Sequence, residues 1–68
     1  MTIYLRGNAE PNSKVYVYRN NSLLASDQVE PNGGFSLYIK NQPQKTVLTV
    51  IVKNSLGVKS KPYKITVK

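Results

Sequence analysis

The chain has 68 residues and a net charge of +7, with no cysteine and no histidine. A disulfide, a thiolate metal site and histidine acid–base catalysis are therefore excluded. The only acidic side chains are Glu10, Asp27 and Glu30, so we expect neither an enzyme nor a bound cofactor or metal. A chain of this length forms one small domain, which buries about 60% of the surface that its unfolded chain exposes.

The positive charge is confined to the second part of the sequence. Residues 1–39 contain equal numbers of cations and anions, whereas residues 40–68 contain seven lysines and no acid. Such asymmetry attracts anionic partners, and the candidate basic surface consists of Lys53, Lys59, Lys61 and Lys64. Lysines also solvate strand edges and discourage edge-to-edge pairing. We favour this second explanation, because the lysines are separated along the chain and no arginine lies among them.

The pattern of apolar residues predicts strands and no helix. Runs with alternating apolar and polar residues are separated by turn signals, and no segment shows the helical period of 3.6 residues. The predicted strands are residues 2–6, 14–18, 22–29, 35–40, 45–54 and 58–68, the last of them bent near Pro62.

Each predicted strand has one apolar face that we expect to point into the core. The expected inward residues are Ile3, Leu5, Val15, Val17, Phe35, Leu37, Ile39, Leu48, Val50 and Val52. Residues 22–29 show no clear register, and their core candidates are Leu23, Leu24, Ala25 and Val29. Residues 45–54 form the longest apolar and β-branched run, which predicts a central strand buried on both faces.

Turn signals separate these runs. Asn20-Asn21 is typical of a tight hairpin turn, because asparagine tolerates a positive φ. Pro31-Asn32-Gly33-Gly34 is the strongest turn signal in the chain. The recurrence of Glu-Pro-Asn at 10–12 and 30–32 reflects turn chemistry and is too short to indicate a repeat. Six or seven short strands with turns every 8–12 residues predict an all-β fold, either an antiparallel sandwich or a small barrel.

Four consecutive stretches together carry a resemblance to a known family. They are IYLRGNAEPNSKVYVYRN at 3–20, SLLASDQVEPNGGFSLYI at 22–39, LTVIVKNSLGVKSKP at 48–62 and YKITVK at 63–68. In this order they resemble a bacterial immunoglobulin-like domain of the kind found in tandem in surface proteins. The resemblance implies a small immunoglobulin-like antiparallel β-sandwich of six to seven strands. Compared with the usual sandwich of the family, we expect the first strand to be missing or supplied by a neighbour.

The sequence departs from the family pattern around residues 52–58. Asn54 stands where the family usually has Asp, Val58 where it has Asn, and Val52 where it has Ala. Some relatives use the acidic turn to hold the loop or a calcium ion. Calcium favours six to eight oxygen ligands with several carboxylates, so Asn54 argues against a calcium site here.

Four tyrosines are the candidate contact surface. The alternation directs Tyr4, Tyr16, Tyr18 and Tyr38 away from the core. In the family topology their strands share one sheet, which would place all four rings on its open face. Such a face suits protein contact or sugar stacking. The alternative is that cross-strand tyrosine pairs only stabilise a small sheet.

The resemblance implies a non-catalytic module of a bacterial secreted or cell-surface protein. We expect residues 1–68 to form a single module excised from a longer protein, acting as a spacer, an adhesion-associated unit or a protein- or glycan-contacting unit. Its expected partners are neighbouring domains of the same chain, together with a host protein, a glycan or an anionic cell-wall polymer.

Two alternatives stay open. The first is an accessory binding module of a polysaccharide- or wall-degrading enzyme. The second is a small basic β-barrel that binds nucleic acid. We do not favour nucleic acid as a partner, because Tyr63 is the only aromatic residue in the basic half of the sequence. No run approaches the roughly 18 apolar residues of a membrane span, so we expect no membrane insertion.

Overall fold

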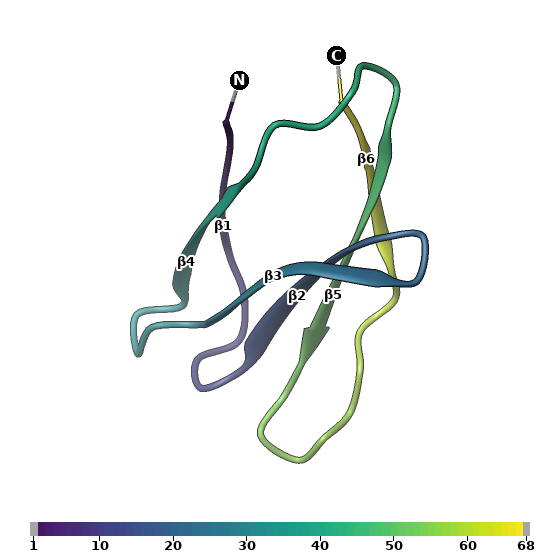
Figure 1. The fold of residues 1–68 in the computed structure, drawn as a ribbon. Helices are drawn as coiled ribbons and strands as arrows, with labels where there is room; N and C mark the ends of the chain where they lie inside the picture. Colours follow the sequence, from purple (N-terminus) through teal and green to yellow (C-terminus); the bar gives the residue numbers. More distant parts are fainter. Residues whose placement is uncertain (1, 68) are drawn as a thin grey trace.

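The structure is a computed structural model that describes residues 2–67 and consists of β-strands joined by turns (Figure 1). The six strands are β1 (Ile3–Asn8), β2 (Lys14–Arg19), β3 (Ser22–Gln28), β4 (Gly34–Ile39), β5 (Val47–Lys53) and β6 (Tyr63–Thr66). Within this described part, no helix is long and apolar enough to cross a membrane.

The strands form two antiparallel sheets that pack face to face. One sheet has two strands, β1 and β4, and the other has four in the order β3-β2-β5-β6. The ribbon view shows the β1-β4 pair on one side of the molecule and the four-stranded sheet on the other (Figure 1). The predicted all-β antiparallel sandwich is therefore confirmed.

The core lies between the two sheets and comes from alternating residues of β2, β4 and β5, together with Val29 just after β3. Its buried members are Val15, Val17, Val29, Leu37, Ile39, Leu48 and Val50. Six of these were predicted as inward from alternation, because successive side chains of a strand point to opposite faces. Ile3, Leu5, Phe35 and Val52 are only partly buried and pack around this cluster.

The prediction that β5 is buried on both faces is only half correct. Leu48 and Val50 are buried in the core, whereas Thr49 and Ile51 on the opposite face are half-buried. No further layer of the described chain covers that opposite face, and the cross-strand neighbours of Thr49 and Ile51 are the tyrosines of β2. One face of β5 therefore packs in the core, and its other face lies beside the tyrosines of β2.

An irregularity in the pairing of β3 explains its unclear sequence pattern. Val17 pairs with Ala25, but the next residue, Tyr18, pairs with Leu23, so Leu24 is an extra residue between the two pairs. Such a bulge interrupts strict alternation. As a result Leu24 and Ala25 both pack against the core, while Leu23, predicted as a core candidate, is 53% exposed.

The two Glu-Pro-Asn segments both form turns, as predicted. The Ser13 N–H donates to the Glu10 carbonyl at 3.2 Å, and the Gly33 N–H donates to the Glu30 carbonyl at 2.8 Å. The residue with positive φ differs, being Asn12 (67°) in the first turn and Gly33 (88°) in the second. The same tripeptide therefore supports two turn geometries, depending on whether glycine follows.

Gly7 is needed because an aromatic ring lies on it. Gly7 of β1 pairs with Phe35 of β4, and a Cβ atom added to Gly7 would lie 2.8 Å from the Phe35 ring. This contact places the ring between the sheets, where it packs against the core. It gives a physical reason for glycine at position 7.

The sandwich is open along one flank, between β1 and β6. The predicted last strand is interrupted, as expected near Pro62, so that Lys59 forms an isolated bridge and β6 begins only at Tyr63. Tyr63 is 74% exposed and borders an apolar groove together with Leu5, Phe35 and Val52. Both ends of the described chain lie at the same end of the molecule (Figure 1).

The packing of Leu48 gives a direct test of the core. Leu48 is 2% exposed, so Leu48→Ala should lower the free energy of unfolding by about 2–5 kcal/mol because it leaves a cavity. Leu56 lies in a turn and is 86% exposed, so Leu56→Ala should change it by no more than about 0.5 kcal/mol. Chemical denaturation of the two variants checks this, and equal effects would contradict the assigned core.

Candidate functional site

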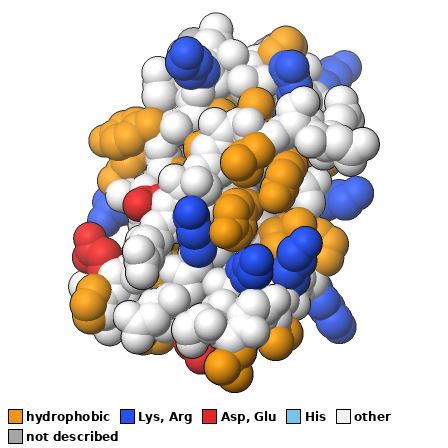
Figure 2. Space-filling model, turned by 60° about the horizontal axis from the view of Figure 1, so that its bottom comes forward, with side chains coloured by type: hydrophobic (Ala, Val, Ile, Leu, Met, Phe, Trp, Pro, Cys, Tyr) orange, Lys and Arg blue, Asp and Glu red, His pale blue; other side chains and the backbone are white. Residues whose placement is uncertain are grey.

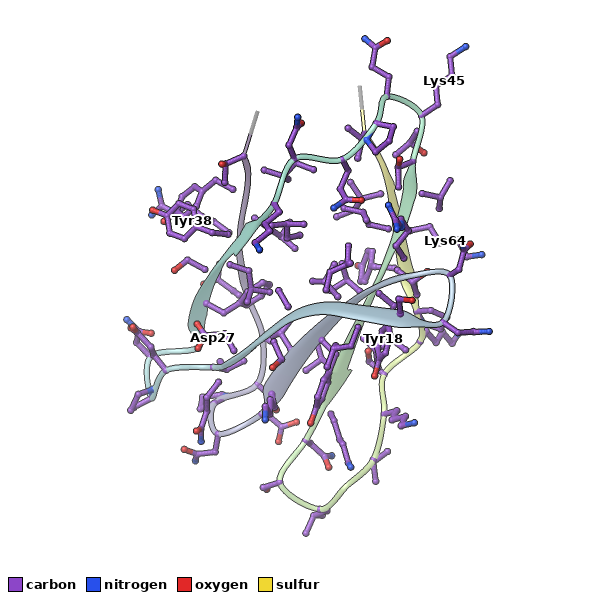
Figure 3. All side chains as sticks on the ribbon, viewed as in Figure 1. Tyr18, Asp27, Tyr38, Lys45 and Lys64 are labelled. Carbon is purple, nitrogen blue, oxygen red and sulfur yellow. The ribbon has the colours of Figure 1, made fainter. Side chains whose placement is uncertain are left out.

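The four candidate tyrosines do not share one sheet, and that prediction is wrong. Tyr4 and Tyr38 lie on the two-stranded sheet, whereas Tyr16 and Tyr18 both lie on β2 of the four-stranded sheet. The labelled side chains of Tyr18 and Tyr38 accordingly stand on different sides of the molecule (Figure 3). The physical reason is that β1 pairs only with β4, while β2 crosses to the other sheet and pairs with β3 and β5.

The first tyrosine pair is a cross-strand contact. Tyr4 and Tyr38 are directly paired residues of β1 and β4, and their ring centroids are 4.6 Å apart at an interplanar angle of 36°. The Arg6 guanidinium lies 5.7 Å from the Tyr4 ring centroid. Cross-strand aromatic pairs of this kind stabilise a sheet by roughly 0.2–1 kcal/mol, which is of value to a sheet of only two strands.

The second tyrosine pair runs along one strand and is accompanied by a cation. Tyr16 and Tyr18 have ring centroids 6.4 Å apart and planes inclined by 25°. The Lys14 ammonium lies 5.5 Å from the Tyr16 ring centroid. All three residues alternate with the buried Val15 and Val17, so they point away from the core on the same face of β2.

Lysines of three neighbouring chain segments line up on this same face. Lys14 of β2 pairs with Lys53 of β5, and Lys53 also pairs with Lys59 through an isolated bridge. We call Lys14, Lys53 and Lys59 the lysine row. Because like charges directly opposite each other destabilise a sheet, the lysine row is an electrostatic cost that an anion would relieve.

Tyr18 borders a groove whose far side is also basic. The groove has a volume of ≈ 390 Å³ and is lined by Tyr18, Asn20, Asn21, Thr49, Ile51, Lys59, Pro62 and Lys64. Thr49 pairs with Tyr18 on one side and with Lys64 on the other, which places all three in one row across the sheet. None of the lining residues is acidic.

We call this solvent-exposed side of the four-stranded sheet the outer face. It is defined by the lysine row together with Tyr16, Tyr18, Thr49, Ile51 and Lys64. The space-filling view shows one side of the molecule on which hydrophobic side chains gather near the middle with several Lys and Arg side chains around them (Figure 2). The outer face therefore combines an aromatic and aliphatic centre with cations at its borders.

The structure thus brings together two groups of residues that the sequence analysis kept apart. Tyr16 and Tyr18 lie beside Lys53, Lys59 and Lys64, although they come from the neutral half of the sequence. Lys61 is exposed but does not line the groove. Sequence reasoning did not include Lys14, Asn20 and Asn21 in the candidate site. Alternation could have identified Lys14, because it shares the face of Tyr16 and Tyr18.

The side-chain amide of Asn54 stabilises the turn after β5. The Asn54 Oδ1 atom accepts hydrogen bonds from the backbone N–H groups of Leu56 at 3.0 Å and Val58 at 2.9 Å. Gly57 provides the positive φ of 87° that reverses the chain, and its N–H donates to the Asn54 carbonyl. The side-chain oxygen of Asn54 is therefore committed to two backbone donors, which close the loop.

This arrangement does not fit calcium. Residues 2–67 contain no group of three or more His, Cys, Asp or Glu side chains that could hold a metal ion. The turn itself offers one neutral amide oxygen, already engaged with N–H groups, whereas calcium requires several oxygen ligands.

These observations define the chain as an immunoglobulin-like β-sandwich whose outer face combines half-buried tyrosines with lysines. The sequence matches the family model described as Bacterial Ig domain over residues 2–68, and the chain belongs to this family. Membership suggests a non-catalytic module, and domains of this family typically occur in surface or extracellular proteins. No curated protein and no solved structure matched the chain.

The Asn54 hydrogen bonds lead to a prediction about the turn. Asn54→Ala should lower the free energy of unfolding by about 1–3 kcal/mol, because two N–H groups lose their acceptor. Asn54→Asp keeps an oxygen at the same position and should unfold close to the original temperature. Thermal denaturation of all three chains, with millimolar calcium or with a chelator, provides the measurement. A melting temperature of the original chain that rises with calcium would contradict the assignment.

The lysine row leads to a prediction about salt. Sodium chloride screens the repulsion between Lys14, Lys53 and Lys59, so the melting temperature should rise with ionic strength. Lys53→Gln should stabilise the chain at low salt by roughly 0.2–1 kcal/mol and weaken this salt dependence. Lys40→Gln is the matched control, because this exposed lysine lies outside the lysine row. Identical salt curves for both variants would show that only net charge matters.

Proposed function

We propose that this chain is a non-catalytic module of a longer bacterial secreted or cell-surface protein. It acts as a spacer that carries a contact surface on its outer face, and its partner is an anionic component of the cell wall or of a host surface. The observation that carries this proposal is the placement of Tyr16 and Tyr18 beside Lys53, Lys59 and Lys64 on one side of the four-stranded sheet.

The composition of the outer face supports binding more than chemistry. Tyrosine presents an apolar ring with a polar hydroxyl group, which suits contact with partners that are partly apolar and partly polar. The surrounding lysines attract anions over a distance of about one Debye length, roughly 8–10 Å at physiological salt. Catalysis by serine or threonine would need a neighbouring base, and Ser26 and Thr49 of this sheet face neutral residues or lysine across the strands.

Neighbouring domains of the same chain are the second class of partner that we propose. Support comes from the open flank, where the apolar groove between β1 and β6 leaves Leu5, Tyr63 and Ile65 accessible. An adjoining segment that covered this flank would bury their apolar surface. The outer face lies on the opposite side of β5 and would stay free for an external ligand.

Two other functions remain as alternatives with specific support. An accessory binding module of a polysaccharide- or wall-degrading enzyme would use the same outer face, so the two roles differ in the domain that adjoins this chain. Binding of single-stranded nucleic acid gains support from the shared position of tyrosines and lysines, since such binders combine aromatic and cationic side chains on one face.

A binding experiment with isolated bacterial cell walls tests the proposal. The chain should sediment with the walls at low salt and be released as ionic strength rises, because the attraction is electrostatic. The double variant Lys53→Gln and Lys59→Gln should lose most of this binding. The matched control is Lys40→Gln with Lys45→Gln, which removes the same charge from the loop region after β4.

Two outcomes would contradict the proposal. The first is that the original chain does not bind the walls at any salt concentration. The second is that both double variants lose the same amount of binding, which would mean that net charge and not the outer face is responsible.

A further inference from the structure

We infer that the ligand of the outer face is an acidic polysaccharide, a chain of sugar rings that carry carboxylate groups. This inference rests on the proposed function and specifies its ligand. In the bound state the apolar side of a sugar ring lies against Tyr16 and Tyr18, and carboxylates contact the lysines at the borders of the face.

The spacing of the outer face suits a polymer with both apolar and anionic parts. The lysine row, the Tyr16–Ile51 pair and the Tyr18–Thr49–Lys64 row follow one another along the strands. Successive rows are two residues apart, which corresponds to about 6.6–6.8 Å in a β-strand. Cations therefore lie at both ends of this face, because the rows that contain Lys53 and Lys64 are separated by four residues of β5, or about 13 Å.

The groove beside Tyr18 adds groups that recognise sugar hydroxyls. Asn20 and Asn21 line it from the turn between β2 and β3, and Thr49 lines it from β5. Carboxamide and hydroxyl side chains both donate and accept hydrogen bonds, as sugar hydroxyls do. The positive φ of Asn20, 55°, belongs to the tight turn that places the two amides next to Tyr18.

The cations of the outer face are lysines. An ammonium group pairs with a carboxylate or a phosphate as a point charge, so the preference for a sugar polymer comes from the tyrosines and from the amide and hydroxyl groups of the groove. Arg19 at the end of β2 donates from its guanidinium to the side-chain oxygen of Gln42 at 2.8 Å. Arg6 lies beside Tyr4 on the two-stranded sheet.

The test is a titration of the 68-residue chain with four probes of similar length. Binding is measured by calorimetry and by changes in amide chemical shifts. The first probe is an oligogalacturonate, which has sugar rings and carboxylates. A maltooligosaccharide has sugar rings without charge, and a linear polyphosphate has charge without rings. The fourth probe, an oligothymidylate, represents single-stranded nucleic acid. We expect the oligogalacturonate to bind most tightly, with the largest shifts in β2, β5 and the turn at residues 20–21.

Three double variants test the assigned roles on the folded chain. Tyr16→Thr with Tyr18→Thr should weaken oligogalacturonate binding by roughly tenfold or more, because stacking is lost while threonine keeps a high strand propensity. Tyr4→Thr with Tyr38→Thr removes the same groups from the other sheet and should leave binding unchanged. Lys53→Gln with Lys64→Gln should weaken binding by a similar factor. Circular dichroism confirms that each variant is folded.

The outcomes separate this inference from the proposed function. Equal binding of polyphosphate and oligogalacturonate, unaffected by the Tyr16 and Tyr18 variants, would overturn the inference but leave an anion-binding module. Tighter binding of oligothymidylate would overturn it in favour of nucleic acid. Absence of binding to every anionic probe, together with failure to bind cell walls, would overturn both.

Discussion

The pairing of β2 with β5 at the centre of the four-stranded sheet is the interaction on which the rest of the structure depends. On its inner side this pairing sets Val17 opposite Val50 and Val15 opposite Val52, so that three buried valines and the partly buried Val52 line the core. On its outer side the same register sets Tyr16 opposite Ile51 and aligns the lysine row. Because side chains alternate along a strand, one register fixes both faces, and a shift by one residue would exchange core and surface.

Local sequence was sufficient to predict the strands and most of the core. Alternation identified Leu48 and Val50 as inward, and asparagine and glycine identified the turns, because both signals depend only on neighbouring residues. The register of β3 could not be predicted, since the bulge at Leu24 arises from its pairing with β2. The interior of this small domain is therefore encoded mainly by local patterns.

The candidate site could be predicted only in part, for a reason of topology. Alternation shows that a tyrosine points outward, but it does not show which strands share a sheet. Tyr4 and Tyr16 both point outward and nevertheless lie on different sheets. The lysine row depends on pairings between residues far apart in the sequence, such as Lys14 with Lys53. A resemblance to a family indicates the fold, whereas the composition of a surface requires the register.

The position of the two chain ends has a mechanical consequence. The start of β1 and the end of β6 lie at the same end of the molecule and belong to different sheets (Figure 1). Tension applied between these two points acts across the strands and opens the cross-strand contacts one after another. The first to open are the Ile3–Ile39 pair in one sheet and the backbone hydrogen bonds of Val67 with Lys45 and Thr46 next to the other. Sequential opening requires less force than shearing a whole strand at once. A segment that covered the open flank could transmit the force to the Asn8 end of β1. The force would then act along β1, and the hydrogen bonds between β1 and β4 would have to break together by shear.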